Sequence, residues 1–347
     1  MKKLHPKIIF HVLINFKLKI KTFYFLIIIG LGFFSSLFSQ QIYSESHMLM
    51  GSAFELTVVM ENEKTAANYI DQAKNEIIRI EKLISSWDKD SETAKINSNA
   101  GIQPIKVSKE LFDLIDRAQK ISKITSGAFD ITFAAIDRIW NFDGGVSEMP
   151  GLGVIQNSIS KIGFHKLELN KKESTVFLPE KGMKIGFGGI GKGYAADQAK
   201  KLLISRGVKG GIINASGDMN TWGKQPDGSP WTVGIINPMN KEKVFSWLSL
   251  EHDAVVTSGN YEKFTQIDGE RFSHIVDPRT GIPSKGIISS TIFANKAELA
   301  DALATATFVM GVESGMFLID QLPNIEAILI DDNGVIYKSK NIEIEKN

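Results

Sequence analysis

The stretch from residue 211 to residue 292 holds one short apolar or β-branched segment after another, with polar and Gly-rich turns between them. Strands are predicted at Ile212–Asn214, Thr232–Ile236, Val244–Leu250, Ala254–Thr257, Ser273–Val276 and Ile287–Phe293. A chain whose strands follow one another in this way lacks the regular strand–helix alternation of a doubly wound sheet. We therefore predict the α+β class, with mixed, largely antiparallel sheets and packed helices.

Apolar residues at helical spacing predict helices on both sides of this stretch. The first predicted helix is Lys64–Ile84, and the second begins after Ser108, which would cap it. The third runs from the Gly-rich turn at 186–193 to about Arg206, and the fourth is Lys296–Met310. The segments Ser85–Asn99 and Asn141–Gly153 are polar or rich in Gly, Asp and Pro, so loops are predicted there. Further strands are predicted at Ala53–Met60, Lys166–Leu169 and Thr175–Leu178, with a closing hairpin formed by Glu326–Ile330 and Val335–Tyr337.

The first 39 residues have the pattern of an export signal. Six lysines and no acidic residue occur in residues 1–44, and an apolar run from Phe23 to Phe34 is followed by Ser35, Ser36 and Ser39. We predict a signal peptide at 1–39, or alternatively an uncleaved anchor that would associate the protein with the inner membrane. Residues 45–340 are predicted to form a single domain that works in the periplasm or elsewhere outside the cytoplasm.

Composition excludes several classes of site. The chain has no cysteine, which rules out disulfides, zinc–thiolate sites, cysteine nucleophiles and a cysteine-linked lipid anchor. The net charge is +1, but the basic N-terminus leaves the rest of the chain mildly acidic. An acidic body argues against nucleic acid as a partner.

Five glycines between Gly186 and Gly193 form the sharpest local motif. The segment matches G-x-G-x-x-G, but no acidic residue lies at Gly207–Ile213, where a dinucleotide fingerprint needs one. It also matches G-x-x-x-x-G-K, but Gly193 follows Lys192 where a phosphate loop has Ser or Thr. Both patterns share the physics of anion binding, since glycines let backbone N–H groups approach a phosphate at the start of a helix. A plain tight turn is the alternative.

Two other segments carry groups suited to catalysis. Asp301 and Thr305 are one helical turn apart and offer hard oxygen ligands for Mg²⁺, although a helix-dipole role for the Asp and a back-bonded Thr would explain them equally. His274 and Asp277 precede a Pro-Gly turn and could act in acid–base catalysis, unless Asp277 only pairs with Arg279.

Taken in order, the motifs resemble the ApbE-like FAD:protein FMN transferases, once called thiamine biosynthesis lipoproteins. The matching stretches are Met50–Gly51, Ser86–Ser91 with Asn97, Gly127–Thr132, Gly188–Asp197, Asn214–Asp218, Thr257–Tyr261, His274–Gly281 and Ala300–Ala306. The resemblance spans about residues 48 to 330. It implies the flavin transferase fold and Mg²⁺-dependent transfer of FMN from FAD to a Thr or Ser hydroxyl of an extracytoplasmic redox protein, with release of AMP.

The resemblance also implies residue roles. FAD would be bound by Met50, Trp87, Ala128, Phe129, Asp130, Gly186, Lys192 and Ile275, and the metal by Gly189, Asp301, Ala304 and Thr305. His274 and Asp277 are the candidate bases. Many members have Asp at position 186 and Tyr at position 87, and some have Asp at position 304. This chain has Gly186, Trp87 and Ala304 instead.

Two other functions use the same motifs. A periplasmic FAD-binding protein, or a pyrophosphatase that splits FAD into FMN and AMP, would need a similar pocket. A role in thiamine synthesis fits an exported protein poorly.

Overall fold

The computed structural model describes residues 40–136, 139–140, 142–146, 148–237, 240–249, 253–260, 264–267 and 270–342. The predicted signal at 1–39 and the motif residue Tyr261 lie outside these residues. The fold is α+β with largely antiparallel sheets, as predicted. An eight-stranded antiparallel sheet forms its centre, in the order β1 (Gln41–Leu49), β2 (Ser52–Met60), β7 (Gly211–Ala215), β8 (Asp218–Trp222), β11 (Ala254–Gly259), β14 (Ile287–Ala294), β15 (Glu326–Asp331) and β16 (Ile336–Lys338).

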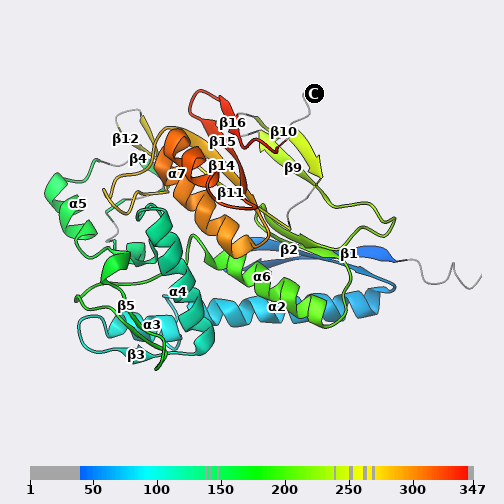
Figure 1. The fold of residues 1–347 in the computed structure, drawn as a ribbon, viewed down its shortest axis with the longest axis horizontal. Coiled ribbons are helices and arrows are strands. Elements are labelled where there is room, and N and C mark those ends of the chain that lie inside the picture. Colours follow the sequence, from blue (N-terminus) through cyan, green and yellow to red (C-terminus); the bar gives the residue numbers. More distant parts are fainter. Residues whose placement is uncertain are drawn as a thin grey trace, which may run out of the picture.

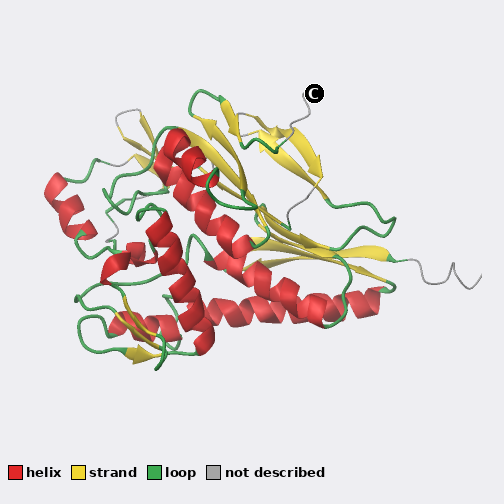
Figure 2. Cartoon of the chain, in the orientation of Figure 1, coloured by secondary structure: helices red, strands yellow, loops and turns green. Residues whose placement is uncertain are grey.

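Three long helices pack on one face of this sheet: α2 (Glu63–Ile84), α6 (Gly191–Ser205) and α7 (Ala297–Ile319) (Figure 1). Figure 2 shows the helices gathered on this side of the strands. The alternation of side chains along the strands explains the layering, because Val256 and Ile292 pack with α7 while their neighbours Val255 and Phe293 pack on the opposite face. Val233 of β9 (Thr232–Asn237), which pairs with β10 (Asn240–Ser249), belongs to that second cluster.

Smaller elements flank the three helices. A second helical group contains α3 (Glu92–Ser98), α4 (Lys109–Ile124), α5 (Leu152–Ile159) and the 3₁₀ turns η1 (Ile131–Ala135) and η2 (Phe164–Lys166). Two three-stranded sheets accompany them, ordered β3 (Ile105–Lys106), β6 (Thr175–Phe177), β5 (Glu168–Asn170) and β13 (Glu270–Ser273), β12 (Phe264–Ile267), β4 (Asp143–Val146).

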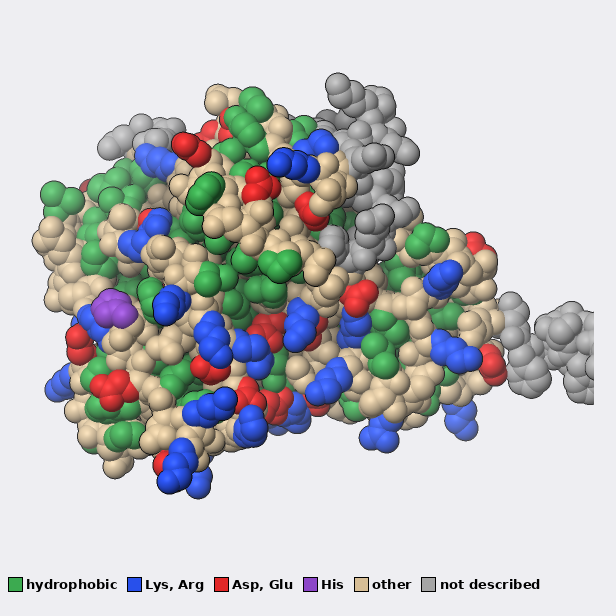
Figure 3. Space-filling view, in the orientation of Figure 1, with side chains coloured by type: hydrophobic (Ala, Val, Ile, Leu, Met, Phe, Trp, Pro, Cys, Tyr) green, Lys and Arg blue, Asp and Glu red, His purple; other side chains and the backbone are tan. Residues whose placement is uncertain are grey.

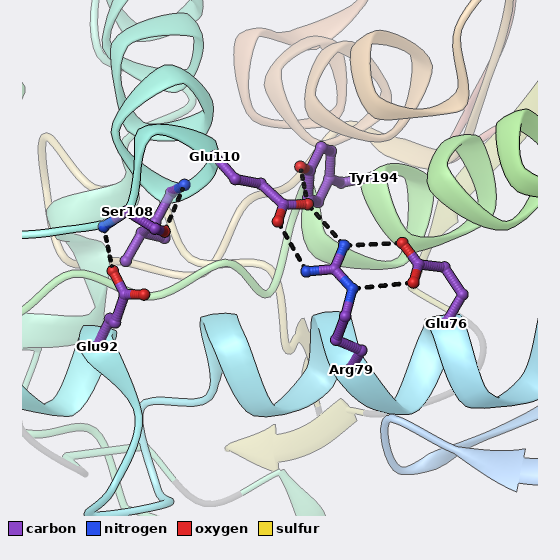
Figure 4. Close-up of polar contacts among 7 residues, drawn as sticks. Glu76, Arg79, Glu92, Ser108, Glu110 and Tyr194 are labelled. Carbon is purple, nitrogen blue, oxygen red and sulfur yellow. Dashed lines mark hydrogen bonds and ion pairs between the residues drawn. The ribbon is translucent and has the colours of Figure 1, made fainter.

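A charged network ties the helices together (Figure 4). Arg79 of α2 donates to Glu76 and, at 2.7 and 2.8 Å, to Glu110 of α4, which also accepts a hydrogen bond from the Tyr194 hydroxyl of α6. These contacts fix three helices that lead to or from the loops of the candidate site. Figure 3 shows charged side chains of both signs intermingled on the face that α2, α4 and α6 share.

Several local predictions were wrong. The segment Ser85–Asn99 contains helix α3, because the Ser91 hydroxyl caps it by accepting from Ala94 N–H. The segment Asn141–Gly153 contains strand β4 and the start of α5. A loop was predicted there because the segment is rich in glycine. Strand β13 ends at Ser273, so His274 lies in the loop that follows.

The remaining predictions agree with the structure except at element ends. Strands β1, β3, β8 and β12 were not predicted, and Leu250 of a predicted strand lies outside the described residues. Helix α7 runs nine residues beyond Met310, through a kink at Gly311 with φ 82°. Among the described residues, only α7 has the length and apolar composition of a membrane-crossing helix, and it packs on β11 and β14 as a core helix.

Candidate active site

A cavity of about 410 Å³ lies where five separate segments of the chain meet. They are the loop after α2, the approach to η1, the glycine loop before α6, the loop after β13, and α7. Nine of the fourteen predicted site residues line it: Trp87, Ala128, Phe129, Asp130, Gly186, Gly189, His274, Ile275 and Thr305. Phe133 and Phe187 also line the cavity and were not predicted.

A second cavity, of about 550 Å³, adjoins the first. The two share Ser86, Trp87, Phe187 and Gly188 as lining residues. Met50 and Lys192 line the second cavity, so they too lie beside the predicted flavin site. Together the two cavities form one larger hollow beside the glycine loop, with room for a larger ligand than either cavity alone.

The glycine loop is shaped by close packing and not by unusual dihedral angles. A Cβ atom on Gly193 would lie 2.1 Å from the carbonyl oxygen of Ala297, and one on Gly186 would lie 2.9 Å from Ala134 Cβ. Only glycine therefore lets the first turn of α6 pack against the start of α7. The motif predicted from sequence thus joins two helices as well as lining the cavity.

Asp301 on α7 lies at the N-terminus of α6. Its Oδ2 accepts a hydrogen bond from Gly193 N–H at 3.0 Å, at a helix end whose N-cap residue, Ile190, provides no side-chain cap. Residue 301 is 4% exposed. Burial raises the pKa of its carboxyl to about 7, with the Lys192 charge acting in the opposite direction and Asp218 adding to the rise. A buried carboxylate with so little compensating charge is a good ligand for a cation.

Thr305 follows Asp301 by one turn of α7 and reaches the cavity wall. A Cβ atom on Gly189 would lie 3.0 Å from Thr305 Oγ1, so the glycine loop and this hydroxyl are neighbours. Carboxylate, hydroxyl and backbone oxygens are the ligands that Mg²⁺ prefers. The donor set at Asp301, Thr305 and Gly189 therefore fits the predicted metal.

Ala304 is not brought into the cavity. It is fully buried among apolar residues of α7, β11 and β14, and its carbonyl oxygen accepts from Thr307 Oγ1 at 3.4 Å. No group of three or more His, Asp or Glu side chains is placed to hold a metal within the described part of the chain. A metal here would therefore depend on one carboxylate and neutral oxygens.

Aromatic side chains form two walls of different character. Trp87 is 77% exposed at the junction of the cavities, whereas Phe129 is buried in the wall next to Gly189. Ala128 beside it is also buried. An exposed indole at a cavity mouth offers a flat surface on which a planar ring can stack.

Asp130 lines the cavity but is committed to its own loop. Its Oδ1 accepts from Thr132 N–H at 2.8 Å and from Thr132 Oγ1 at 2.7 Å, and its Oδ2 accepts from Phe164 N–H at 2.7 Å. Burial raises the pKa of Asp130, and these hydrogen bonds oppose the rise. Asp130 thus caps η1 and shapes the wall that carries Phe129.

His274 and Asp277 differ in position. His274 lines the cavity, together with Ile275. The Asp277 carboxylate instead accepts from Arg279 N, Nε and Nη2 at 2.8, 2.9 and 2.8 Å and is not among the lining residues. Of the two candidate bases, the structure brings only His274 to the cavity.

Asp218 contacts Lys192 from outside the two cavities, and it was not among the predicted site residues. It forms an ion pair with Lys192 through Oδ2, and its Oδ1 accepts from Thr257 N–H at 3.2 Å. The stretch Asn214–Asp218 was one of those that resemble the family, but no role was predicted for its acidic residue. An acidic residue at the end of that stretch was the available signal, but nothing in the sequence paired it with Lys192.

Comparison with known proteins identifies relatives along nearly the whole described chain. The ApbE family matches residues 50–329. An FAD:protein FMN transferase of Klebsiella pneumoniae is 30% identical over 295 residues, covering 84% of this chain and 90% of the relative, and one of Treponema pallidum is 30% identical over 307 residues, covering 83% and 84%.

Solved structures of similar proteins have the same fold. The ApbE protein of Thermotoga maritima superposes with a TM-score of 0.79 at 30% identity, covering 86% of this chain and 97% of its own. The flavin transferase ApbE of Vibrio cholerae gives 0.76 at 25% identity, covering 87% and 98%.

Proposed function

The chain belongs to the ApbE family and is an FAD:protein FMN transferase, and we propose that it joins FMN from FAD to a Thr or Ser hydroxyl of a redox protein outside the cytoplasm. The reaction requires Mg²⁺ and releases AMP. One observation carries this proposal: His274, the aromatic Trp87 and two proposed metal donors, Gly189 and Thr305, line the same cavity. A protein that only binds FAD gains nothing from such a histidine.

The hollow fits FAD by shape and chemistry. Two adjoining cavities can hold the two halves of a dinucleotide, with Trp87 at their junction as a stacking surface. The glycine loop between them lies at the N-terminus of α6, where the helix dipole favours an anion. Lys192 lines the second cavity and adds a positive charge for the pyrophosphate.

The bond changes are those of a phosphoryl-group transfer. The acceptor oxygen forms a bond to the FMN phosphorus, the bond from that phosphorus to the bridging oxygen breaks, and AMP leaves with the electron pair. His274 accepts the proton of the acceptor hydroxyl as the oxygen attacks. Asp277 does not take this role because Arg279 holds its carboxylate.

The protein would hold Mg²⁺ through Asp301, Thr305 and the backbone of Gly189. A bound Mg²⁺ would offset the negative charge that grows on the bridging oxygen. The N–H group of Gly193 fixes the Asp301 carboxylate in place.

Acceptor modification tests the proposal. Purified protein is incubated with FAD, Mg²⁺ and an exported redox protein that carries a candidate Thr, and intact mass of the acceptor is recorded. We expect a mass gain of one FMN moiety, which is absent when that Thr is replaced by Val. Production of FMN and AMP with no modified acceptor, across several acceptors, would favour a pyrophosphatase instead.

Export is proposed on the sequence alone. The basic and apolar pattern of residues 1–39 supports it. N-terminal sequencing of the exported protein should begin near Gln40 or Gln41, whereas an intact Met1 in the membrane fraction would show an anchor at the inner membrane.

A further inference from the structure

The turn between β7 and β8 fixes the backbone position of one acidic residue, Asp218. Ser216 and Gly217 have positive φ angles of 54° and 98°, and they form the two-residue connection between the paired residues Ala215 and Asp218. Asn214 Oδ1 accepts from Gly217 N–H at 2.8 Å, which reinforces the turn. Asp218 is therefore the first residue of a strand inside the central sheet, and its backbone has little freedom.

Both carboxylate oxygens of Asp218 have partners. Oδ1 accepts from the backbone N–H of Thr257 on the neighbouring strand β11, and Oδ2 forms the ion pair with Lys192. Residue 218 is 4% exposed and lines neither cavity. Any effect of Asp218 on a ligand must therefore pass through another side chain.

Lys192 is the side chain that connects Asp218 to the ligand site. It lines the second cavity beside Gly188 and Met50. A lysine side chain has four rotatable bonds, so a free ammonium would spread over many positions. A carboxylate anchored to the sheet removes most of this freedom.

A second carboxylate lies within range of the charge on the same ammonium. The charge of Lys192 acts on Asp301, which is buried next to Gly193 at the start of the same helix. If Lys192 moved to Asp301, it would occupy the oxygen atoms proposed for the metal. The ion pair with Asp218 directs the Lys192 ammonium to the other carboxylate.

We propose that Asp218 is a positioning residue that keeps the Lys192 ammonium at the cavity for the FAD pyrophosphate and keeps it off Asp301. The inference rests on the proposed function, since it takes FAD as the ligand. It assigns Asp218 no contact with FAD or with the metal. The loss of Asp218 should consequently matter only while Lys192 is present.

A double-mutant cycle on FAD affinity tests this dependence. The variants are Asp218→Asn, Lys192→Met and the double variant, with FAD binding followed by flavin fluorescence at several Mg²⁺ concentrations. Asp253→Asn is the matched control, because it breaks the 2.8 Å ion pair of Lys200 on the same helix, away from the cavities. Thermal unfolding of every variant is measured alongside.

We expect Asp218→Asn to weaken FAD binding about 10- to 100-fold, the usual effect of losing one partner of a charged hydrogen bond. It should also raise the Mg²⁺ concentration needed for tight FAD binding. In the Lys192→Met background the same substitution should change neither quantity by more than about twofold. Asp253→Asn should bind FAD as the unmodified protein does.

Three results would overturn the inference. Normal FAD affinity in Asp218→Asn would show that Lys192 is placed without Asp218. A lower melting temperature with unchanged affinity would show a purely structural ion pair. A weaker Mg²⁺ response that persists in the Lys192→Met background would make Asp218 a metal ligand. Because these binding assays need no acceptor protein, failure of flavin transfer would refute the proposed function without affecting this outcome.

Discussion

The Asp301 carboxyl should make the metal-free protein less stable as the pH rises. Its pKa lies at about 7 in the folded protein against an ordinary value of 3.8. The folded state therefore binds this proton more tightly than the unfolded state does, and raising the pH from about 4 to about 7 lowers the free energy of unfolding. A difference of about three pKa units corresponds to roughly 4 kcal/mol.

Replacing Asp301 by Asn removes the charge and keeps an oxygen that can accept from Gly193 N–H. The amide of the Asp301→Asn variant cannot ionise, so in EDTA this variant should lack the loss of stability. At pH 8 its melting temperature should exceed that of the unmodified protein by on the order of 5–10 °C. At pH 4.5 the two proteins should melt within about 2 °C of each other.

Adding Mg²⁺ should remove more than half of this difference in stability. A ligand that binds only the folded state at 100 times its Kd stabilises that state by about 2.7 kcal/mol. The unmodified protein should gain this stability at pH 8, and Asp301→Asn should not. The assay is thermal unfolding at pH 4.5 and 8, in EDTA and in Mg²⁺. Parallel pH dependence of the two proteins, or an equal gain from Mg²⁺, would refute the reasoning.

Three further changes probe other parts of the site. His274→Ala should slow transfer to the acceptor about 10²–10⁴-fold, measured by acceptor mass, and leave FAD affinity within a few-fold, measured by flavin fluorescence. Asp277→Asn should slow transfer less than tenfold, and a larger loss in Asp277→Asn than in His274→Ala would make Asp277 the base. Trp87→Ala should weaken FAD binding about tenfold and Trp87→Phe much less, so equal losses in a titration would exclude stacking. Gly193→Ala should lower the free energy of unfolding by about 1–3 kcal/mol in a denaturant titration, because its Cβ would lie 2.1 Å from a carbonyl oxygen; an unchanged midpoint would contradict the close packing of α6 on α7.

Local patterns predicted most of the elements correctly, because burial and spacing coincide in this chain. The apolar residues of Lys64–Ile84 recur at helical spacing, and all of Ile70, Ala73, Ile77, Ile80 and Ile84 are buried in α2. No local sequence pattern indicated the order of the strands in the central sheet. Strand β2 pairs with β7, more than 150 residues later, and pairing at that distance depends on tertiary packing.

Residue contacts within the site were the least predictable feature. Asp301 was expected to act at its own helix terminus or on a metal, and its contact with Gly193 of α6 follows only from how the two helices cross. Asp277 was expected either as a base or as the partner of Arg279, and the sequence alone did not decide for the ion pair that the structure shows. Resemblance to a family could place Asp130 at the site, yet its three hydrogen bonds show that it also builds the wall.

The ratio of AMP released to flavin attached is the most direct test of the central claim. Both products are quantified in one reaction that contains the protein, FAD, Mg²⁺ and an acceptor with a single target Thr. Transfer to the acceptor predicts one AMP for each FMN joined to that Thr, and no free FMN. AMP formed with an equal amount of free FMN, and none on the acceptor, would contradict the account.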